Sequence, residues 1–431
     1  MNFYSLNKKA PNVSFKDAVI KGIAPDRGLY FPESITPLTL DFFNKIETLS
    51  TTEIAFEAIK QFVGDEIPEN ELKKIIEDTL SFDFPVVPIN ESIATLELFH
   101  GPTMAFKDVG ARFMARCFGY FNKEKATTKV TVLVATSGDT GGAVASGFFG
   151  VEGIDVVILY PSGKVSDVQE KQLTTLGNNI KALEVNGTFD DCQTMVKTAF
   201  LDDELTSQRN LTSANSINVA RWLPQMFYFF FAYKQLKDKK KDLIFSIPSG
   251  NFGNICAGIM AQQLGLPIKQ FIAATNANDI VPNYLKTGIY TPKPSKQTIS
   301  NAMDVGDPSN FIRIQEIYGT DTELKKHLTS YSFSDDETRE AMKEIKNNSG
   351  YIADPHGAVG YLGLKEYFKN NKGQGIFLET AHPVKFLDVV EPVLNETIKY
   401  PQQILNVIDK EKISFKISTY QELKNYLINT K

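Results

Sequence analysis

The sequence is poor in the side chains that most often bind metals or form disulfides. Its 431 residues include three cysteines and four histidines. Cys117, Cys192 and Cys256 lie far apart and form no CxxC pair. This spacing argues against a structural zinc site and against a disulfide framework, and it fits a reducing cytosol. We therefore expect no metal site and a cytoplasmic protein.

Long apolar runs and an excess of positive charge are also missing. No stretch reaches the roughly 18 apolar residues that a membrane span requires, and Met1 to Leu6 lacks the features of a signal peptide. The densest apolar patch, Phe227 to Phe231, is short, and we interpret it as core or subunit interface. The net charge is −5, so nothing favours a nucleic acid, and a small anionic ligand needs its own local site. No membrane or nucleic-acid partner is expected.

The pattern of apolar residues changes near residue 90. Up to there the chain reads as short elements and helices, whereas beyond it strands alternate with helices. Such alternation predicts an α/β fold in which parallel sheets are covered by helices. We expect an N-terminal domain over 1–90 and a catalytic region over 91–431. The expected strands are 129–135, 154–160, 180–185 and 243–247, and the expected helices are 165–176, 190–201 and 255–264.

Two loops of small residues follow predicted strands, at 137–141 and 249–254. Glycines between a strand and a helix let backbone N–H groups converge on an anion. Neither loop has the Lys-Ser/Thr ending of a nucleoside triphosphate loop or the GxGxxG pattern of a nicotinamide-dependent dehydrogenase. Asp139-Thr140-Gly141 occurs once, whereas aspartic proteases need two such carboxylates side by side. A plain tight turn remains the alternative for 249–254.

Lys107 lies at a predicted junction between a loop and a helix. It follows apolar Ala105 and Phe106, and Asp108 is expected to cap the helix. Partial desolvation lowers the pKa of a lysine and frees its amine to attack a carbonyl. A solvated surface lysine is the alternative. Two anion-binding loops and one such lysine together suit a phosphorylated aldehyde cofactor and an anionic amino acid.

Several motifs, in order along nearly the whole chain, resemble the threonine synthase family, which belongs to the tryptophan-synthase-β-like class of pyridoxal-phosphate enzymes. Any one motif is moderately specific, but their succession is very specific. Arg27 stands where a glycine is common, and Asn254 where an aspartate is common. The motifs are 24–30, 101–108, 137–141, 213–218, 249–254, 301–306, 354–357 and 379–383.

The resemblance implies two doubly wound, mostly parallel sheet domains of fold type II, with a smaller N-terminal domain. It implies pyridoxal 5'-phosphate as cofactor, O-phosphohomoserine as substrate, and Lys107 as the catalytic residue that binds the cofactor as a Schiff base. The other implied cofactor-binding residues are Ser249, Gly250, Asn251, Phe252, Gly253, Asn254 and Thr380. The candidate substrate-binding residues are Thr103, Ser137, Gly138, Asp139, Thr140, Ser213, Asn215, Asn218 and Arg221.

The implied reaction is a β,γ-replacement that yields threonine and phosphate, with domain closure to exclude early water. A threonine-synthase-like phospholyase, or another fold type II lyase or dehydratase, is the alternative, and a cofactor-free binding module is a more distant one. Arg221 could instead form an ion pair on a helix face. His356 and His382 are either hydrogen bonders behind the site or packed structural residues. Both a monomer and a homodimer suit the fold.

Overall fold

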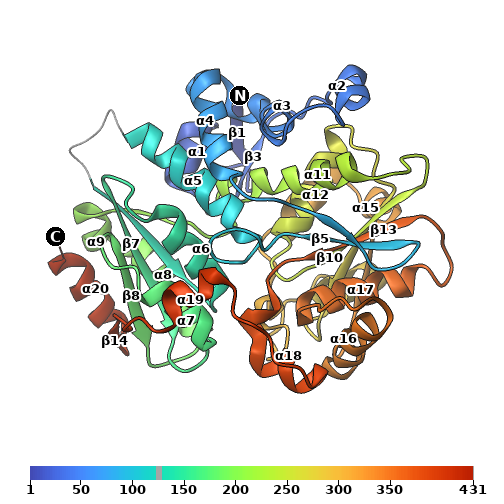
Figure 1. The fold of residues 1–431 in the computed structure, drawn as a ribbon. Helices are drawn as coiled ribbons and strands as arrows, with labels where there is room; N and C mark the ends of the chain where they lie inside the picture. Colours follow the sequence, from blue (N-terminus) through green and yellow to red (C-terminus); the bar gives the residue numbers. More distant parts are fainter. Residues whose placement is uncertain (123–128, 431) are drawn as a thin grey trace.

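The computed structural model describes residues 1–122 and 129–430. Figure 1 shows two lobes side by side, each built around a sheet, with the N-terminal segment lying across them. The strands of the described residues form sheets of three, six and five strands. The three-stranded sheet is N-terminal, the six-stranded sheet forms the larger lobe and the five-stranded sheet forms the smaller lobe.

The N-terminal region combines a small antiparallel sheet with helices that pack on the lobes. Helix α3 begins with a capping box, in which Ser50 and Glu53 exchange hydrogen bonds. It packs against α11, and α4 packs against α5. The elements are β1 (Asn2–Ser5), β2 (Val13–Ser14), α1 (Phe15–Lys21), β3 (Tyr30–Pro32), α2 (Leu40–Lys45), α3 (Thr51–Val63) and α4 (Glu69–Thr79).

The larger lobe contains a sheet with the strand order β12-β11-β10-β13-β5-β4. Every neighbouring pair is parallel except β4 and β5, so the antiparallel strand lies at the edge. Helix α17 packs on β10, β11 and β13. The strands are β4 (Val86–Pro88), β5 (Ile93–Glu97), β10 (Leu243–Pro248), β11 (Gln270–Thr275), β12 (Leu328–Ser332) and β13 (Gln374–Glu379), and the main helices are α11 (Phe227–Gln235), α12 (Gly253–Gln263), α16 (Asp335–Ser349) and α17 (Pro355–Tyr367).

The smaller lobe contains a parallel sheet with the order β14-β8-β7-β6-β9. The C-terminal strand β14 pairs with β8, so the end of the chain returns to this lobe, as the red segment beside the green one shows in Figure 1. The strands are β6 (Val130–Ala135), β7 (Ile154–Pro161), β8 (Ile180–Val185), β9 (Asn210–Thr212) and β14 (Phe415–Ile417), and the main helices are α5 (Lys107–Asn122), α6 (Asp139–Phe148), α7 (Asp167–Thr174), α8 (Phe189–Leu201), α10 (Val219–Trp222) and α20 (Tyr420–Asn429).

The expected α/β fold with mostly parallel sheets is confirmed, and the predicted strands coincide closely with β6, β7, β8 and β10. The apolar run Phe227 to Phe231 is buried core within α11. One local expectation is wrong: α5 begins at Lys107, so Asp108 lies inside the first turn and does not cap the helix. The three cysteines are free and buried. Within the ranges that the structure describes, no helix is both long and apolar enough to cross a membrane.

Candidate functional site

Three segments that the sequence assigns to the cofactor meet at one edge of the larger sheet. Strands β10, β13 and β5 are parallel neighbours, so their carboxyl ends lie side by side. The 249–254 loop follows β10, Thr380 follows β13, and the loop to Lys107 follows β5. The Phe106 N–H donates to Thr380 O at 2.8 Å, and Ala105 forms an isolated bridge with Ala381. The fold therefore brings Lys107 and Thr380 together.

The side chains of the 249–254 loop hold the loop itself in shape. Ser249 Oγ donates to Ile247 O at 2.8 Å, and Asn254 Nδ2 donates to Pro248 O at 2.9 Å. Asn251 Oδ1 accepts from the N–H of Ser309 at 2.7 Å. These contacts leave the backbone, and not the side chains, to meet a ligand.

The backbone of this loop fits a phosphate group. Phe252 has φ +61° directly before α12, which turns the chain into the helix. The first N–H groups of a helix lack intrahelical acceptors, and the helix dipole favours an anion there. A Cβ atom on Gly250 would lie 2.7 Å from Met303 Cα, so a glycine is required for the turn at 301–303 to pack against the loop.

Lys107 has an environment that suits a lysine nucleophile. Lys107 is only partly exposed, and burial lowers the pKa of its ammonium group. Asp139 opposes this shift, whereas Lys385 and Arg221 add to it. Lys107 Nζ lies 5.7 Å from the centre of the Phe106 ring. The amine is thus easier to deprotonate than that of a solvated lysine.

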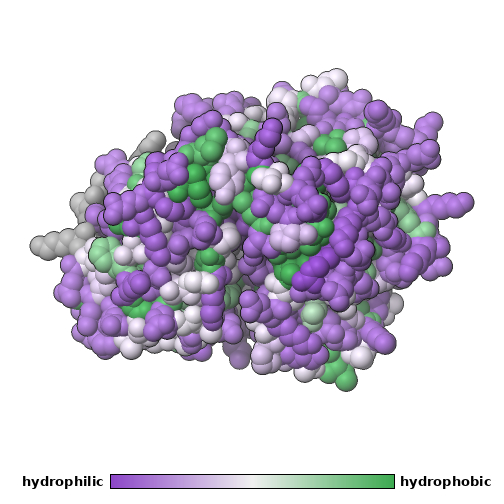
Figure 2. Space-filling model, turned by 60° about the horizontal axis from the view of Figure 1, so that its bottom comes forward, coloured by the Kyte–Doolittle hydropathy of each residue, from purple (hydrophilic) through white to green (hydrophobic). Residues whose placement is uncertain are grey.

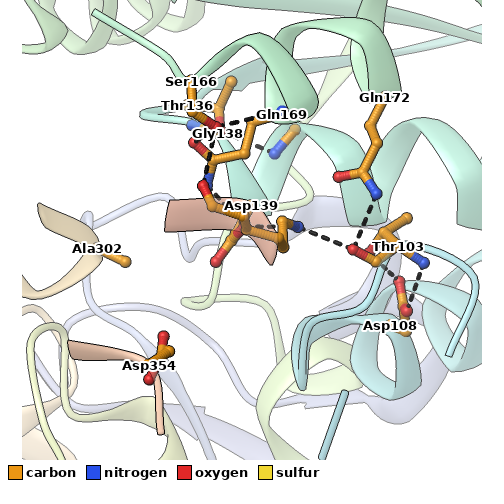
Figure 3. Close-up of polar contacts among 12 residues, drawn as sticks. Thr103, Asp108, Thr136, Gly138, Asp139, Ser166, Gln169, Gln172, Ala302 and Asp354 are labelled. Atoms are coloured by element: carbon orange, nitrogen blue, oxygen red, sulfur yellow. Dashed lines mark hydrogen bonds and ion pairs between the residues drawn. The ribbon is translucent and has the colours of Figure 1, made fainter. Parts of the chain in front are cut away.

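Asp108 braces the loop that precedes Lys107. Its carboxylate accepts from the Thr103 N–H at 2.9 Å and from the Thr103 hydroxyl. Thr103 O in turn accepts from Gln172 Nε2 of α7 at 3.0 Å (Figure 3). In this arrangement the Thr103 hydroxyl holds the loop, and its contact with a substrate stays a prediction.

The loops assigned to the substrate meet at the facing edge of the smaller sheet. Strands β6 and β9 are parallel neighbours, which brings the loops 136–140 and 213–218 together. Thr136 Oγ1 accepts from the N–H groups of Gly138 and Gly141, at 2.9 and 2.8 Å. The N–H of Gly138 is therefore already engaged, whereas the half-buried side chains of Ser137 and Thr140 reach the surface of the loop.

Polar side chains of the 213–218 loop form hydrogen bonds within the protein. Ser213 Oγ accepts from the N–H of Asn215 at 3.3 Å. Asn218 caps α10, accepts from the Ala220 N–H at 3.0 Å and donates to Val19 O at 2.8 Å. Asn218 thus ties this loop to the N-terminal region, and its direct contact with a substrate stays a prediction.

Arg221 is a buried cation near Lys107 and is not an ion pair on a helix face. Only 2% of its surface is exposed, and its Nη1 donates to Ala214 O. Among the described residues, no hydrogen-bond partner meets its Nε. Burial lowers its pKa to about 10, against the attraction of Tyr228 and Asp108. A buried guanidinium with a free donor suits an incoming anion.

Lys385 is a residue of this site that the sequence analysis missed. It is fully buried in the short helix Pro383–Phe386, and its Nζ lies 2.6 Å from Asp139 Oδ1 and 2.8 Å from Thr103 O. Gln169 Nε2 donates to the same Asp139 oxygen at 2.8 Å (Figure 3). A single lysine inside the apolar run Pro383 to Leu387 is the signal that could have revealed it.

The two histidines of the motifs 354–357 and 379–383 differ in their surroundings. His356 is buried; its Nδ1 lies 2.7 Å from Asp354 Oδ2, and its Nε2 accepts from the Ala302 N–H at 3.2 Å. It therefore supports the 301–303 turn that packs on Gly250. His382 caps the helix at 383–386, and its Nδ1 accepts from the Val384 N–H at 3.1 Å.

A cavity of about 430 Å³ opens between the lobes next to these residues. It is lined from the smaller lobe by 163–166 and from the larger lobe by 297–299, Asn301 and Asp388, among others. Asn301 adjoins the turn over Gly250, and Ser166 caps the helix that carries Gln169. Figure 2 shows a furrow between the two halves of a largely hydrophilic surface. The cavity is lined from both lobes, but Lys107, Thr380 and Arg221 are not among its lining residues.

Comparisons with known proteins identify the family of the chain. Residues 90–376 match the family model described as pyridoxal-phosphate dependent enzyme, and residues 2–80 match the model described as threonine synthase N terminus. The threonine synthase of Buchnera aphidicola subsp. Baizongia pistaciae is 45% identical over 431 residues, which cover 99% of this chain and 100% of the relative.

Solved structures give the same result. The threonine synthase of Escherichia coli superposes with a TM-score of 0.94 at 41% identity and full coverage of both chains. The pyridoxal-phosphate-bound threonine synthase of Brucella melitensis superposes with a TM-score of 0.92 at 33% identity, covering 99% of each chain. The chain belongs to the threonine synthase family of pyridoxal-phosphate dependent enzymes.

Proposed function

We propose that this chain converts O-phosphohomoserine and water to L-threonine and phosphate, with pyridoxal phosphate as its cofactor. The proposal rests on two sets of loops, one at the edge of the larger sheet and one at the edge of the smaller sheet, that face each other. Lys107, Thr380 and the 249–254 loop lie together at one edge, facing the loops 136–140 and 213–218 and the buried Arg221.

The backbone N–H groups of Gly250 to Asn254 hold the cofactor phosphate in this proposal, because the loop side chains are engaged with the protein. Lys107 would hold the cofactor covalently, and Thr380 would offer its hydroxyl to the pyridine nitrogen. When bound, pyridoxal phosphate would supply an electron sink next to the substrate α-carbon. A hydroxyl partner would leave the ring nitrogen uncharged or weakly charged.

The substrate carboxylate is bound by the loop Ser137 to Thr140, through N–H groups other than that of Gly138 and through the hydroxyls. The substrate phosphate is bound by Arg221, whose free Nε and buried position favour a dianion. Ser213 and Asn215 line the same edge. Asn218 serves chiefly by holding the 213–218 loop to Val19.

Lys107 removes the α-proton of the substrate, and burial lowers the pKa of its amine, which favours the neutral form that accepts a proton. It then moves protons within reach of its Nζ while phosphate leaves from Cγ and water adds at Cβ. Closure of the two lobes over the cavity keeps water out until phosphate has left.

The remaining assignments concern the chain as a whole. We propose a domain boundary near residue 90, between an N-terminal domain over 1–90 and a catalytic region over 91–431. Three free, buried cysteines support a cytoplasmic location. The protein acts as a monomer or a homodimer, which its mass in solution distinguishes.

The test is a product assay in which purified protein, pyridoxal phosphate and O-phosphohomoserine are incubated together. Threonine, 2-oxobutyrate and phosphate are quantified in one reaction. We expect one threonine for each phosphate released. Phosphate with 2-oxobutyrate and little threonine would instead indicate a phospholyase, and release of neither product would overturn the proposed substrate.

A further inference from the structure

Asp139 is an unexpected charge in a loop that is proposed to bind an anion. Its carboxylate is buried at the start of α6, with 5% of the residue exposed. An uncompensated carboxylate here would repel the substrate and would also favour the protonated form of Lys107 nearby. The site therefore needs a cation that pairs with Asp139 and does not itself bind the ligand.

Lys385 has the contacts of such a cation. It comes from the larger lobe, is fully buried and reaches Asp139 Oδ1 at 2.6 Å. The same ammonium donates to Thr103 O at 2.8 Å, in the loop that leads to Lys107. Its own backbone oxygen accepts from Ser166 Oγ of the smaller lobe at 3.0 Å. Lys385 thus joins the two lobes beside the reactive lysine.

We infer that Lys385 is a positioning residue that neutralises Asp139 across the seam between the lobes and so sets the charge beside Lys107. Lys385 does not act on the substrate in this scheme. It holds the Asp139 carboxylate in place with the help of Gln169, which donates to the same oxygen. The inference rests on the proposed attachment of the cofactor to Lys107.

The charged and titratable groups around Lys107 come from several elements. Asp139 belongs to α6, Lys385 to the helix at 383–386 and Arg221 to α10. Asp108 lies on the same helix as Lys107, and Tyr228 of α11 donates to Phe106 O. Asp139 and Lys385 pair directly, so removing either one changes the local charge by one unit.

The experiment measures the visible absorbance of the full-length, cofactor-bound chain as a function of pH. The absorbance midpoint reports protonation at the nitrogen that links lysine to cofactor. Lys385→Met leaves Asp139 unpaired and should raise this midpoint by about one unit or more. Asp139→Asn should lower it by a similar amount, and the double variant Asp139→Asn/Lys385→Met should return it toward the wild-type value.

Lys343→Met is the matched control, because Lys343 pairs with Glu340 on the exposed face of α16 and lies outside the site. Its midpoint should equal that of the wild type. If Lys385→Met does not fold, Asp139→Asn and the double variant carry the comparison. An unchanged midpoint in folded Lys385→Met, or in Asp139→Asn, would overturn the inference.

The outcome is separable from that of the product assay. Shifted midpoints without threonine formation would contradict the proposed reaction and support the inference about Lys385. Threonine formation with unmoved midpoints would contradict the inference alone. If the absorbance band of the lysine–cofactor link survives in Lys107→Ala, another lysine holds the cofactor, and the inference falls with that assignment.

Discussion

The two loop edges that face each other across the site are built alike but use their side chains differently. At the edge of the larger lobe, Ser249, Asn251 and Asn254 are all bonded to backbone, which fixes the loop before any ligand arrives. At the edge of the smaller lobe, Ser137 and Thr140 are half-buried and Arg221 keeps a free donor. A preformed backbone site suits a ligand that stays bound, whereas free side chains suit one that is exchanged at each turnover.

The largest expected effect comes from the residue between the two edges. Lys107→Ala removes both the covalent attachment and the base, so kcat should fall by at least about 1,000-fold. The visible absorbance band of the lysine–cofactor link should disappear as well. The stability of the variant and the wild type without cofactor, measured by thermal unfolding, should be similar because only a partly exposed side chain is shortened. Retained turnover would contradict the role of Lys107.

The preformed 249–254 loop, at the edge of the larger lobe, is tested by filling the space beside Gly250. Gly250→Ala places a Cβ 2.7 Å from Met303 Cα, which forces the loop and the 301–303 turn apart. Cofactor affinity, measured by fluorescence titration, should fall by about 10- to 100-fold. Gly119→Ala is the control, because a Cβ there meets Val151 at an ordinary 3.5 Å. Equal affinities in the two variants would show that the loop is not preformed.

The edge of the smaller lobe, where side chains are free to bind substrate, is tested at Arg221. Arg221→Lys keeps the positive charge but removes the planar donor set, so KM for O-phosphohomoserine should rise by about 10-fold. Cofactor affinity should not change, since the cofactor loop lies on the other edge. A variant that loses cofactor and substrate affinity equally would contradict the division of roles between the edges.

His356 supports the 249–254 loop through the 301–303 turn that packs on Gly250. His356→Leu leaves the Ala302 N–H and the Asp354 Oδ2 atom without the imidazole, which should lower the free energy of unfolding by about 1–3 kcal/mol. Cofactor affinity should fall with it, because the 301–303 turn packs on Gly250. Chemical denaturation gives the first quantity and fluorescence titration the second. Lost stability with unchanged affinity would make His356 a core residue alone.

His382 is expected to give the smallest effect, visible in the pH dependence of stability. Burial lowers its pKa to about 4, from 6.5, so it stays neutral in the folded chain. Between pH 6.5 and 4 the unfolded chain therefore binds more protons at this residue, and the unfolding free energy falls as the pH falls. His382→Asn keeps a capping side chain and should make this slope shallower in denaturation series. An identical slope would contradict the assigned burial.

The sequence by itself determined the class of fold and supplied the candidate residues of the site. Strands such as Val130–Ala135 follow from β-branched and apolar runs, and small-residue loops such as 249–254 follow from the need to turn between a strand and a helix. Spacing and composition are local properties. The resemblance of ordered motifs added Thr380 and Arg221 to the candidates.

Only the tertiary structure decided which contacts these residues make. It made β10, β13 and β5 neighbours and returned the C-terminal strand to the smaller lobe. It engaged Asn218 with Val19, 199 positions away in the chain, and paired Lys385 with Asp139. Contacts between distant segments depend on strand order and on burial, which no local pattern encodes. The charge around Lys107 is therefore a property of the fold, although each charged residue is visible in the sequence.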